Sequence, residues 1–155
     1  MQRNGGGSRA NCAYSLRMGD YRRVRAWEAA VKVAKKTREV VSRFPRRGYS
    51  ELRAQMISSA ESIAHNIAEG RTATSQDEYN RFLDVAARSA SEVASQLDMA
   101  YEYGIVPQRE KFALMGSIIC TRRMIRSLQE TIRHRERPLK DAGKKAAAKG
   151  PDKKR

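Results

Sequence analysis

Ser62-Ile63-Ala64-His65-Asn66-Ile67-Ala68-Glu69-Gly70 is the stretch with the clearest structural signal in this chain. Ile63 and Ile67 lie four residues apart, and the same apolar spacing extends backwards through Leu52, Met56 and Ala60. Apolar residues that recur at three- and four-residue steps form one face of a helix. The stretch therefore predicts a helix over residues 51–69, with Gly70 suited to the left-handed turn that ends many helices.

Glu69 lies in the last turn of this predicted helix, where a carboxylate meets the negative end of the helix dipole. Such a position favours a cationic partner, and Arg71, Arg81 and Arg88 are the candidates nearby. The alternative is a solvated glutamate at an ordinary helix end. We expect Asn66, Glu69 and Gly70 to form a structural motif, with no catalytic role.

The first helix is predicted over residues 21–43, with Asp20 as its cap and Phe44-Pro45 after its end. Its apolar residues cover an arc of about 180°, wider than one neighbour requires. They are Trp27, Ala30, Val31, Val33, Ala34, Val40, Val41 and Phe44. The opposite side aligns a basic strip of Arg25, Lys32, Lys36 and Arg43. This strip is a candidate nucleic-acid contact, and a merely solvated helix face is the alternative.

A third helix begins at a capping box, with Ser75 as the cap and Glu78 three residues later, and Gly104 ends it after Tyr103. The fourth helix starts at Pro107 and is expected to end before Pro138. Four long helices with short connections, and no strand pattern, predict an all-α fold. The expected architecture is an up-down-up-down antiparallel four-helix bundle.

Basic residues also occur outside the strip. Arg46-Arg47-Gly48 forms a basic turn between the first two helices. In the fourth helix, a second apolar row of Phe112, Met115 and Ile119 becomes basic at Arg122 and Arg126. We take Arg46, Arg47, Arg122 and Arg126 as further candidate nucleic-acid contacts.

The chain has 155 residues and a formal net charge of +15. Residues 1–17 contribute +3 and residues 137–155 contribute +6, which leaves +6 for the body. The composition of the two ends predicts disorder there, around a single bundle over residues 18–136. A sequence pI near 10.4 favours polyanionic partners or a membrane surface.

Two cysteines are too few for a disulfide framework, and Cys120 is expected to be a small buried side chain in the fourth helix. No apolar run is long enough for a membrane helix, and the N-terminal stretch lacks the apolar segment of a signal peptide. A cytoplasmic protein without membrane contact is therefore expected.

Several residues resemble those of a known family, namely the four-helix-bundle proteins encoded in intervening sequences of bacterial 23S rRNA genes. The resemblance covers roughly residues 21 to 133. It rests on the central stretch with Gln55, and on Trp27-Glu28-Ala29, Phe44-Pro45, Leu52, Glu78, Arg81-Phe82-Leu83, Ala86, Ser89, Glu92 and Gln96-Leu97. The sequence departs from the family pattern at Ile57 and Ser58, where two Arg are usual, at Ala64 and at Arg88.

The resemblance implies a cyclic pentamer. It also implies a relationship to the accessory variability determinants of diversity-generating retroelements, which are basic bundles that associate with RNA and a reverse transcriptase. The chain is thus expected to bind RNA or DNA backbones with weak sequence specificity, as an accessory to such an enzyme or in an rRNA context. The alternative is a protein–protein interaction scaffold with no direct nucleic-acid role.

The sequence gives little support to a catalytic or metal site. Glu61, His65 and Glu69 share one helix face, but the chain lacks the Glu-x-x-His pairs that di-iron bundles place on two helices. There is no Gly-rich phosphate loop, Cys-x-x-Cys pair or Ser-His-Asp pattern. We therefore expect no enzyme activity, no cofactor and no metal.

Overall fold

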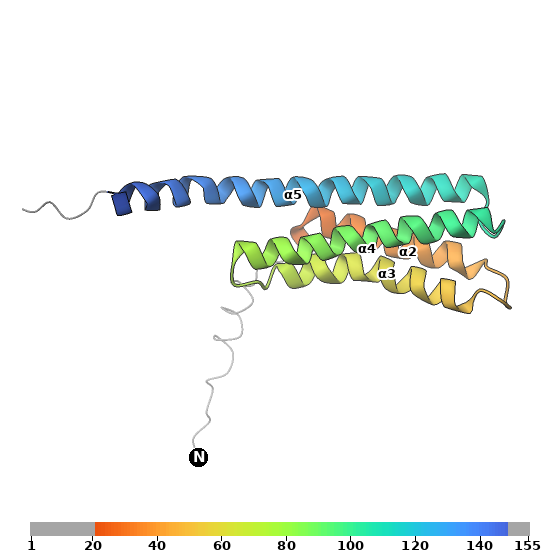
Figure 1. Cartoon of the computed structure of the whole chain (residues 1–155). Helices are drawn as coiled ribbons and strands as arrows, with labels where there is room; N and C mark the ends of the chain where they lie inside the picture. The colour runs from red at the N-terminus through yellow and green to blue at the C-terminus, as the bar shows by residue number, and fades with distance from the viewer. Residues whose placement is uncertain (1–20, 149–155) are drawn as a thin grey trace, which may run out of the picture.

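The computed structural model describes the backbone of residues 21–148 and the side chains of residues 21–134. Within this part, all regular structure is helical (Figure 1). A short 3-10 helix, η1 (Tyr21–Arg23), precedes α2 (Arg25–Ser42), α3 (Ser50–Gly70), α4 (Gln76–Glu102) and α5 (Gln108–Ala148). The predictions for residues 1–17, for the Asp20 cap and for residues 149–155 lie outside the described residues.

Each of the four long helices packs against two others. α2 contacts α3 and α5, and α4 contacts the same two helices. The predicted all-α fold with four helices is confirmed, and the arrangement in Figure 1 is compatible with the predicted antiparallel bundle. No helix in the described part is both long enough and apolar enough to cross a membrane.

The core contains the apolar faces that the sequence periodicity predicts. Met56, Ile63 and Ile67 of α3 are fully buried, as are Leu83 and Leu97 of α4. On α2 the predicted wide arc divides in two. Its central residues are buried, whereas Trp27, Val31 and Ala34 remain half-buried along the side that faces α3.

Two of the predicted helix ends are confirmed. The Oγ of Ser75 accepts a hydrogen bond from the Glu78 backbone N–H at 3.1 Å. The Glu78 carboxylate in turn accepts bonds from the backbone N–H and the hydroxyl of Thr74, which hold the pKa of Glu78 below its ordinary value. At the other end of α4, Gly104 has a φ of 70° and stops the helix.

Gly70 differs from its predicted role. Among the described residues, only Gly48 and Gly104 have positive φ, so Gly70 does not form a left-handed turn. It is the last residue of α3 and is buried. A Cβ at this position would lie 2.5 Å from Cδ2 and 2.7 Å from Cε2 of Tyr79. Gly70 is therefore a packing residue, which lets the end of α3 approach the start of α4.

The fourth helix was predicted to end before Pro138, and this prediction is wrong. The backbone of α5 remains helical to Ala148, and this helix extends well past the ends of the others (Figure 1). Proline inside a helix removes one backbone hydrogen bond and its ring clashes with the preceding turn, so α5 continues past Pro138 against the preference of this residue. Residues 139–148 are rich in Ala and Lys, which are strong helix formers.

Candidate functional site

The charge of the bundle is divided between its two sides. α2 carries five Lys or Arg against two Glu, and residues 108–134 of α5 carry six against two. α3 has one Arg against three Glu, and α4 has two Arg against six carboxylates. Since α2 lies beside α5 and α3 lies beside α4, the molecule has one basic side and one acidic side. The net charge of +6 over residues 18–136 is modest because these opposite charges partly cancel.

A groove of about 600 Å³ runs between α2 and α5 on the basic side. We call it the α2/α5 groove. Its α2 wall contains four cationic side chains, Arg25, Lys32, Lys35 and Lys36, and one carboxylate, Glu28. Three of the predicted strip residues therefore come together in one concave surface, together with Lys35, which the sequence analysis did not select.

The α5 wall of this groove is uncharged and made largely of small residues. It contains Ala113, Gly116, Ser117 and Cys120, with Thr121 and Met124 further along the helix. Cys120 is exposed here, so the prediction of a buried thiol is wrong. Helical spacing places Thr121 in register with the buried Ile118 and Ile125, whereas Cys120 lies about 100° further around the axis, so its apolar neighbours in the sequence did not indicate burial.

Contacts with α5 hold the other end of the basic strip. The Nζ of Lys36 donates a hydrogen bond to the Oγ of Ser117 at 2.8 Å. Arg43 forms an ion pair with Glu110. The strip therefore borders α5 along its length, and Arg43 already has a carboxylate partner. In contrast, Arg25 and Lys32 make no hydrogen bond or ion pair with the side chains of residues 21–134.

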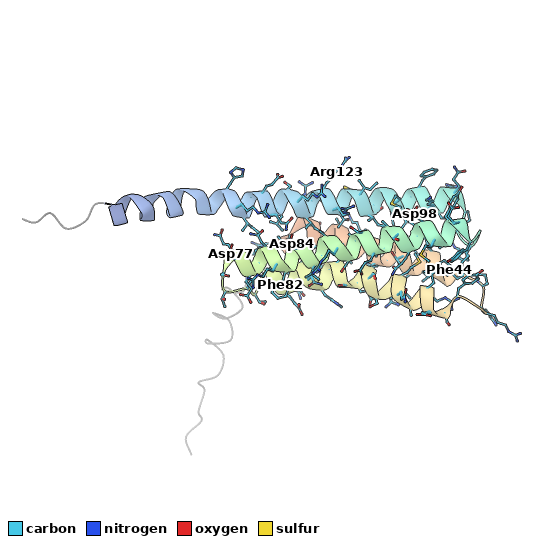
Figure 2. All side chains as sticks on the ribbon, in the orientation of Figure 1. Phe44, Asp77, Phe82, Asp84, Asp98 and Arg123 are labelled. Carbon is cyan, nitrogen blue, oxygen red and sulfur yellow. The ribbon has the colours of Figure 1, made fainter. Side chains whose placement is uncertain are left out.

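The remaining basic candidates lie elsewhere. Arg46 and Arg47 are exposed in the connection between α2 and α3. Arg122 and Arg126 lie on the flank of α5 that faces α4, on the opposite side from Cys120. On this flank Gln129 donates to Asp84 at 2.7 Å and Lys111 pairs with Asp98 at 2.9 Å; Asp84 and Asp98 both lie along α4 (Figure 2).

The motif of α3 is structural. Asn66 donates to the backbone carbonyl of Ser62 at 2.8 Å and to its hydroxyl at 3.0 Å. The hydroxyl of Ser62 lies 3.0 Å from that of Ser89 in α4. A short chain of hydrogen bonds thus connects the two acidic helices at a half-buried position.

Glu69 does not make the expected ion pair. Its side chain is exposed, and no ion pair within the described residues includes it. Arg71 instead lies over the ring of Tyr79, 5.8 Å from its centroid. The expectation failed because Glu69 points outward from the helix end, whereas Tyr79 occupies the space beside Gly70.

The family model of the 23S rRNA-intervening sequence protein matches residues 22–127. The chain belongs to this family. The matched range covers η1, α2, α3, α4 and the first part of α5, including the whole α2/α5 groove. No curated protein matches the chain.

This member of the 23S rRNA-intervening sequence protein family also exposes several large apolar side chains. Phe112 is 63% exposed and Ile119 is 44% exposed, both on the second apolar row of α5. Met99 of α4 and Tyr103, the residue after α4, are exposed as well. A separate groove of about 360 Å³ between α2 and α3 is lined by Trp27 and other apolar residues, beside the Arg38–Glu61 ion pair. Exposed apolar side chains of this kind are candidates for contact with a partner.

Glu61, His65 and Glu69 do not form a metal centre. In the part of the chain whose side chains are described, no group of three or more His, Cys, Asp or Glu lies close enough to hold a metal ion. Glu61 is engaged with Arg38 of α2, whose Nε donates to it at 2.9 Å. The three residues line a shallow polar depression on the outer face of α3.

Proposed function

We propose that this family member is a non-catalytic protein that binds the backbone of RNA or DNA with weak sequence specificity. The observation that carries the proposal is the row of cations on α2, of which Arg25, Lys32, Lys35 and Lys36 line the α2/α5 groove. A surface that gathers Lys and Arg on one side attracts phosphates, whereas the same charges spread evenly attract them less.

Weak sequence specificity follows from the kind of residues on this side. The α2/α5 groove contains no aromatic side chain, so it offers no platform on which a base can stack. Its polar residues are mostly long cations, which position a backbone but do not read base edges by themselves. The interaction is therefore electrostatic.

Self-assembly is part of the proposal. The exposed side chains of Phe112 and Ile119 on α5 and the half-buried Trp27 on α2 provide apolar surface for contacts between copies. Basic and acidic helices on one molecule also suit a head-to-tail contact, and such contacts close into rings where the rotation between copies returns to the first copy. We propose a cyclic pentamer. Light scattering that returned a monomer mass at micromolar concentration would contradict it.

The same surfaces suggest the setting in which the protein acts. A non-enzymatic bundle that holds nucleic acid on one side and protein on another is suited to assist a nucleic-acid enzyme. We propose a reverse transcriptase or an rRNA-associated complex as the partner, in the cytoplasm. Co-purification of the full-length chain with its neighbouring gene products tests this step, and a chain that never co-purifies with nucleic acid or an enzyme argues against it.

Binding of the full-length protein to unrelated RNA and DNA across a salt series tests the central proposal. The logarithm of the affinity should fall linearly with the logarithm of salt, by about 0.9 per neutralised duplex phosphate and about 0.7 for single strands. Scrambled sequences should compete about as well as the probe. No binding at low salt would reject the proposal. One sequence that outcompeted all others a thousandfold would reject the backbone mechanism.

A scaffold without a nucleic-acid role is the second candidate, and the exposed apolar residues of α4 and α5 favour it. In that case the basic side would contact an acidic protein surface. The two candidates differ in one measurement, because a scaffold retains its protein partner while it shows no salt-dependent affinity for RNA or DNA.

A further inference from the structure

Gly116 occupies an unusual position inside α5, nearer its N-terminal end. It lies in a helix, where glycine is less favourable than any other residue except proline. Its φ is not positive, so no special backbone conformation requires it. A Cβ at Gly116 would meet no atom of the described chain within 4 Å. Nothing among the described residues explains why this position lacks a side chain, in contrast with Gly70, where Tyr79 fills the space.

The missing side chain leaves space in the α2/α5 groove, since Gly116 lies on its α5 wall. The neighbouring wall residues Ala113 and Ser117 are also small. Across the groove, the α2 wall presents Arg25, Lys32 and Lys36; Glu28 adds one carboxylate to this wall, and Lys36 donates to Ser117 on the other. With a rise of about 1.5 Å per residue, these three cations span about 16 Å along the helix. The result is a narrow, uncharged floor beside a row of positive charges.

We propose that one phosphodiester strand lies in the α2/α5 groove, with its phosphates against the α2 cations and its bases directed outward. The inference rests on the proposed function and specifies the site within it. A linear row of cations beside a narrow cleft suits a linear polyanion, whereas a compact anion would need cations that converge on one point. The absence of aromatic residues from the groove leaves the bases without a stacking surface, so only the backbone is held.

The strand lies beside Gly116, because any larger side chain at this position would project into the space of the phosphodiester backbone. The volume of the groove limits what it can hold. About 600 Å³ accommodates a short piece of one strand and not a whole duplex. A duplex can contact the site only through the backbone of one of its strands. Single-stranded and duplex probes therefore show whether the phosphodiester strand belongs to a single-stranded nucleic acid or to a duplex.

The substitution Gly116→Leu tests the site without any change of charge. The added side chain meets no atom near its Cβ, and leucine is a better helix former than glycine, so the fold is expected to persist. Ser95→Leu is the matched control, since Ser95 is exposed on the acidic helix α4, away from the groove. Thermal unfolding and light scattering of both variants report on fold and assembly.

Fluorescence anisotropy with a labelled poly(U) oligonucleotide and a duplex of equal length measures the affinity. We expect Gly116→Leu to weaken poly(U) binding about tenfold or more and to lower the salt slope, as lost phosphate contacts require. The duplex should lose less affinity, and Ser95→Leu should bind both probes as the wild type does.

If wild type binds and Gly116→Leu binds equally well, the groove is not the site, although the proposed function stands. If wild type binds neither probe, the proposed function itself fails. If Gly116→Leu changes the mass of the assembly while the affinity per protomer is unchanged, the groove holds a second copy and the inference is wrong.

Discussion

Gly70 of α3 and Tyr79 of α4 approach so closely that a Cβ on the glycine would overlap the aromatic ring, at 2.5 Å from Cδ2. Tyr79 is itself buried, so its ring has little room to move. The contact joins the C-terminal end of one helix to the N-terminal start of the next, across a connection of five residues.

The substitution Gly70→Ala should therefore destabilise the protein. Overpacking of a filled site typically costs about 1–3 kcal/mol, which outweighs the gain of up to about 1 kcal/mol from the better helix propensity of alanine. Urea unfolding measures the difference. Gly116→Ala is the matched control, because its Cβ meets nothing and its stability should increase slightly. Equal effects at the two glycines would contradict the packing role of Gly70.

The hydrogen-bond chain from Asn66 through Ser62 to Ser89 should contribute to stability. Replacement of Asn66 by alanine removes both of its bonds to Ser62, and we expect a loss of about 0.5–1.5 kcal/mol in the free energy of unfolding. Glu69→Gln, one turn further along α3, is the control. Because Glu69 is exposed and unpaired, its replacement should change stability by less than about 0.5 kcal/mol. A larger loss from Glu69→Gln than from Asn66→Ala would reverse this assignment.

The cap of α4 should respond to pH through Glu78. The backbone N–H of Thr74, and then its hydroxyl, hold the pKa of Glu78 below its ordinary value of 4.5. A carboxyl whose pKa is lower in the folded state stabilises the fold above the unfolded pKa, and this contribution is lost as the pH falls through the folded pKa. Wild type should therefore exceed Glu78→Gln in stability at neutral pH. The difference should shrink below pH 4.5 in a pH series of urea unfolding curves. A constant difference across that range would reject the role of the carboxylate.

Cations of the basic strip should differ in their contribution to nucleic-acid binding. Lys32 lines the groove without a partner, whereas Arg43 is paired with Glu110. We expect Lys32→Gln to reduce the salt slope by up to about 0.7–0.9, the value of one phosphate contact, and Arg43→Gln to reduce it less. Binding isotherms across a salt series give both slopes. A larger change for Arg43→Gln would show that the turn end of α2, and not the groove, meets the phosphates.

Much of this fold follows from local sequence rules. The spacing of Ile63 and Ile67 placed the buried face of α3, and the capping pair Ser75 and Glu78 located the start of α4 to the residue. The match to the 23S rRNA-intervening sequence protein family agrees with the motif around Asn66 and Gly70. These features were predictable because periodicity and capping depend on residues within a few positions of each other.

Only part of the candidate site could be predicted from the sequence. The strip of Arg25, Lys32 and Lys36 was evident from helical spacing, since its residues share one face of one helix. The groove was not evident from the sequence, because its second wall comes from α5, about eighty to ninety residues further along the chain. Gly116 did carry a signal, namely a glycine inside a helix with no turn to explain it, but only the packed structure shows that its space is empty.

The sequence by itself determined which segments are helical, which faces are apolar and which family the chain belongs to, because each of these depends on short-range patterns. The tertiary structure alone decided that the basic helices α2 and α5 lie side by side, that the acidic helices α3 and α4 do the same, and that Arg43 is neutralised while Lys32 is not. Electrostatic attraction depends on distances in space, and the chain order of the helices does not provide those distances until the bundle has packed.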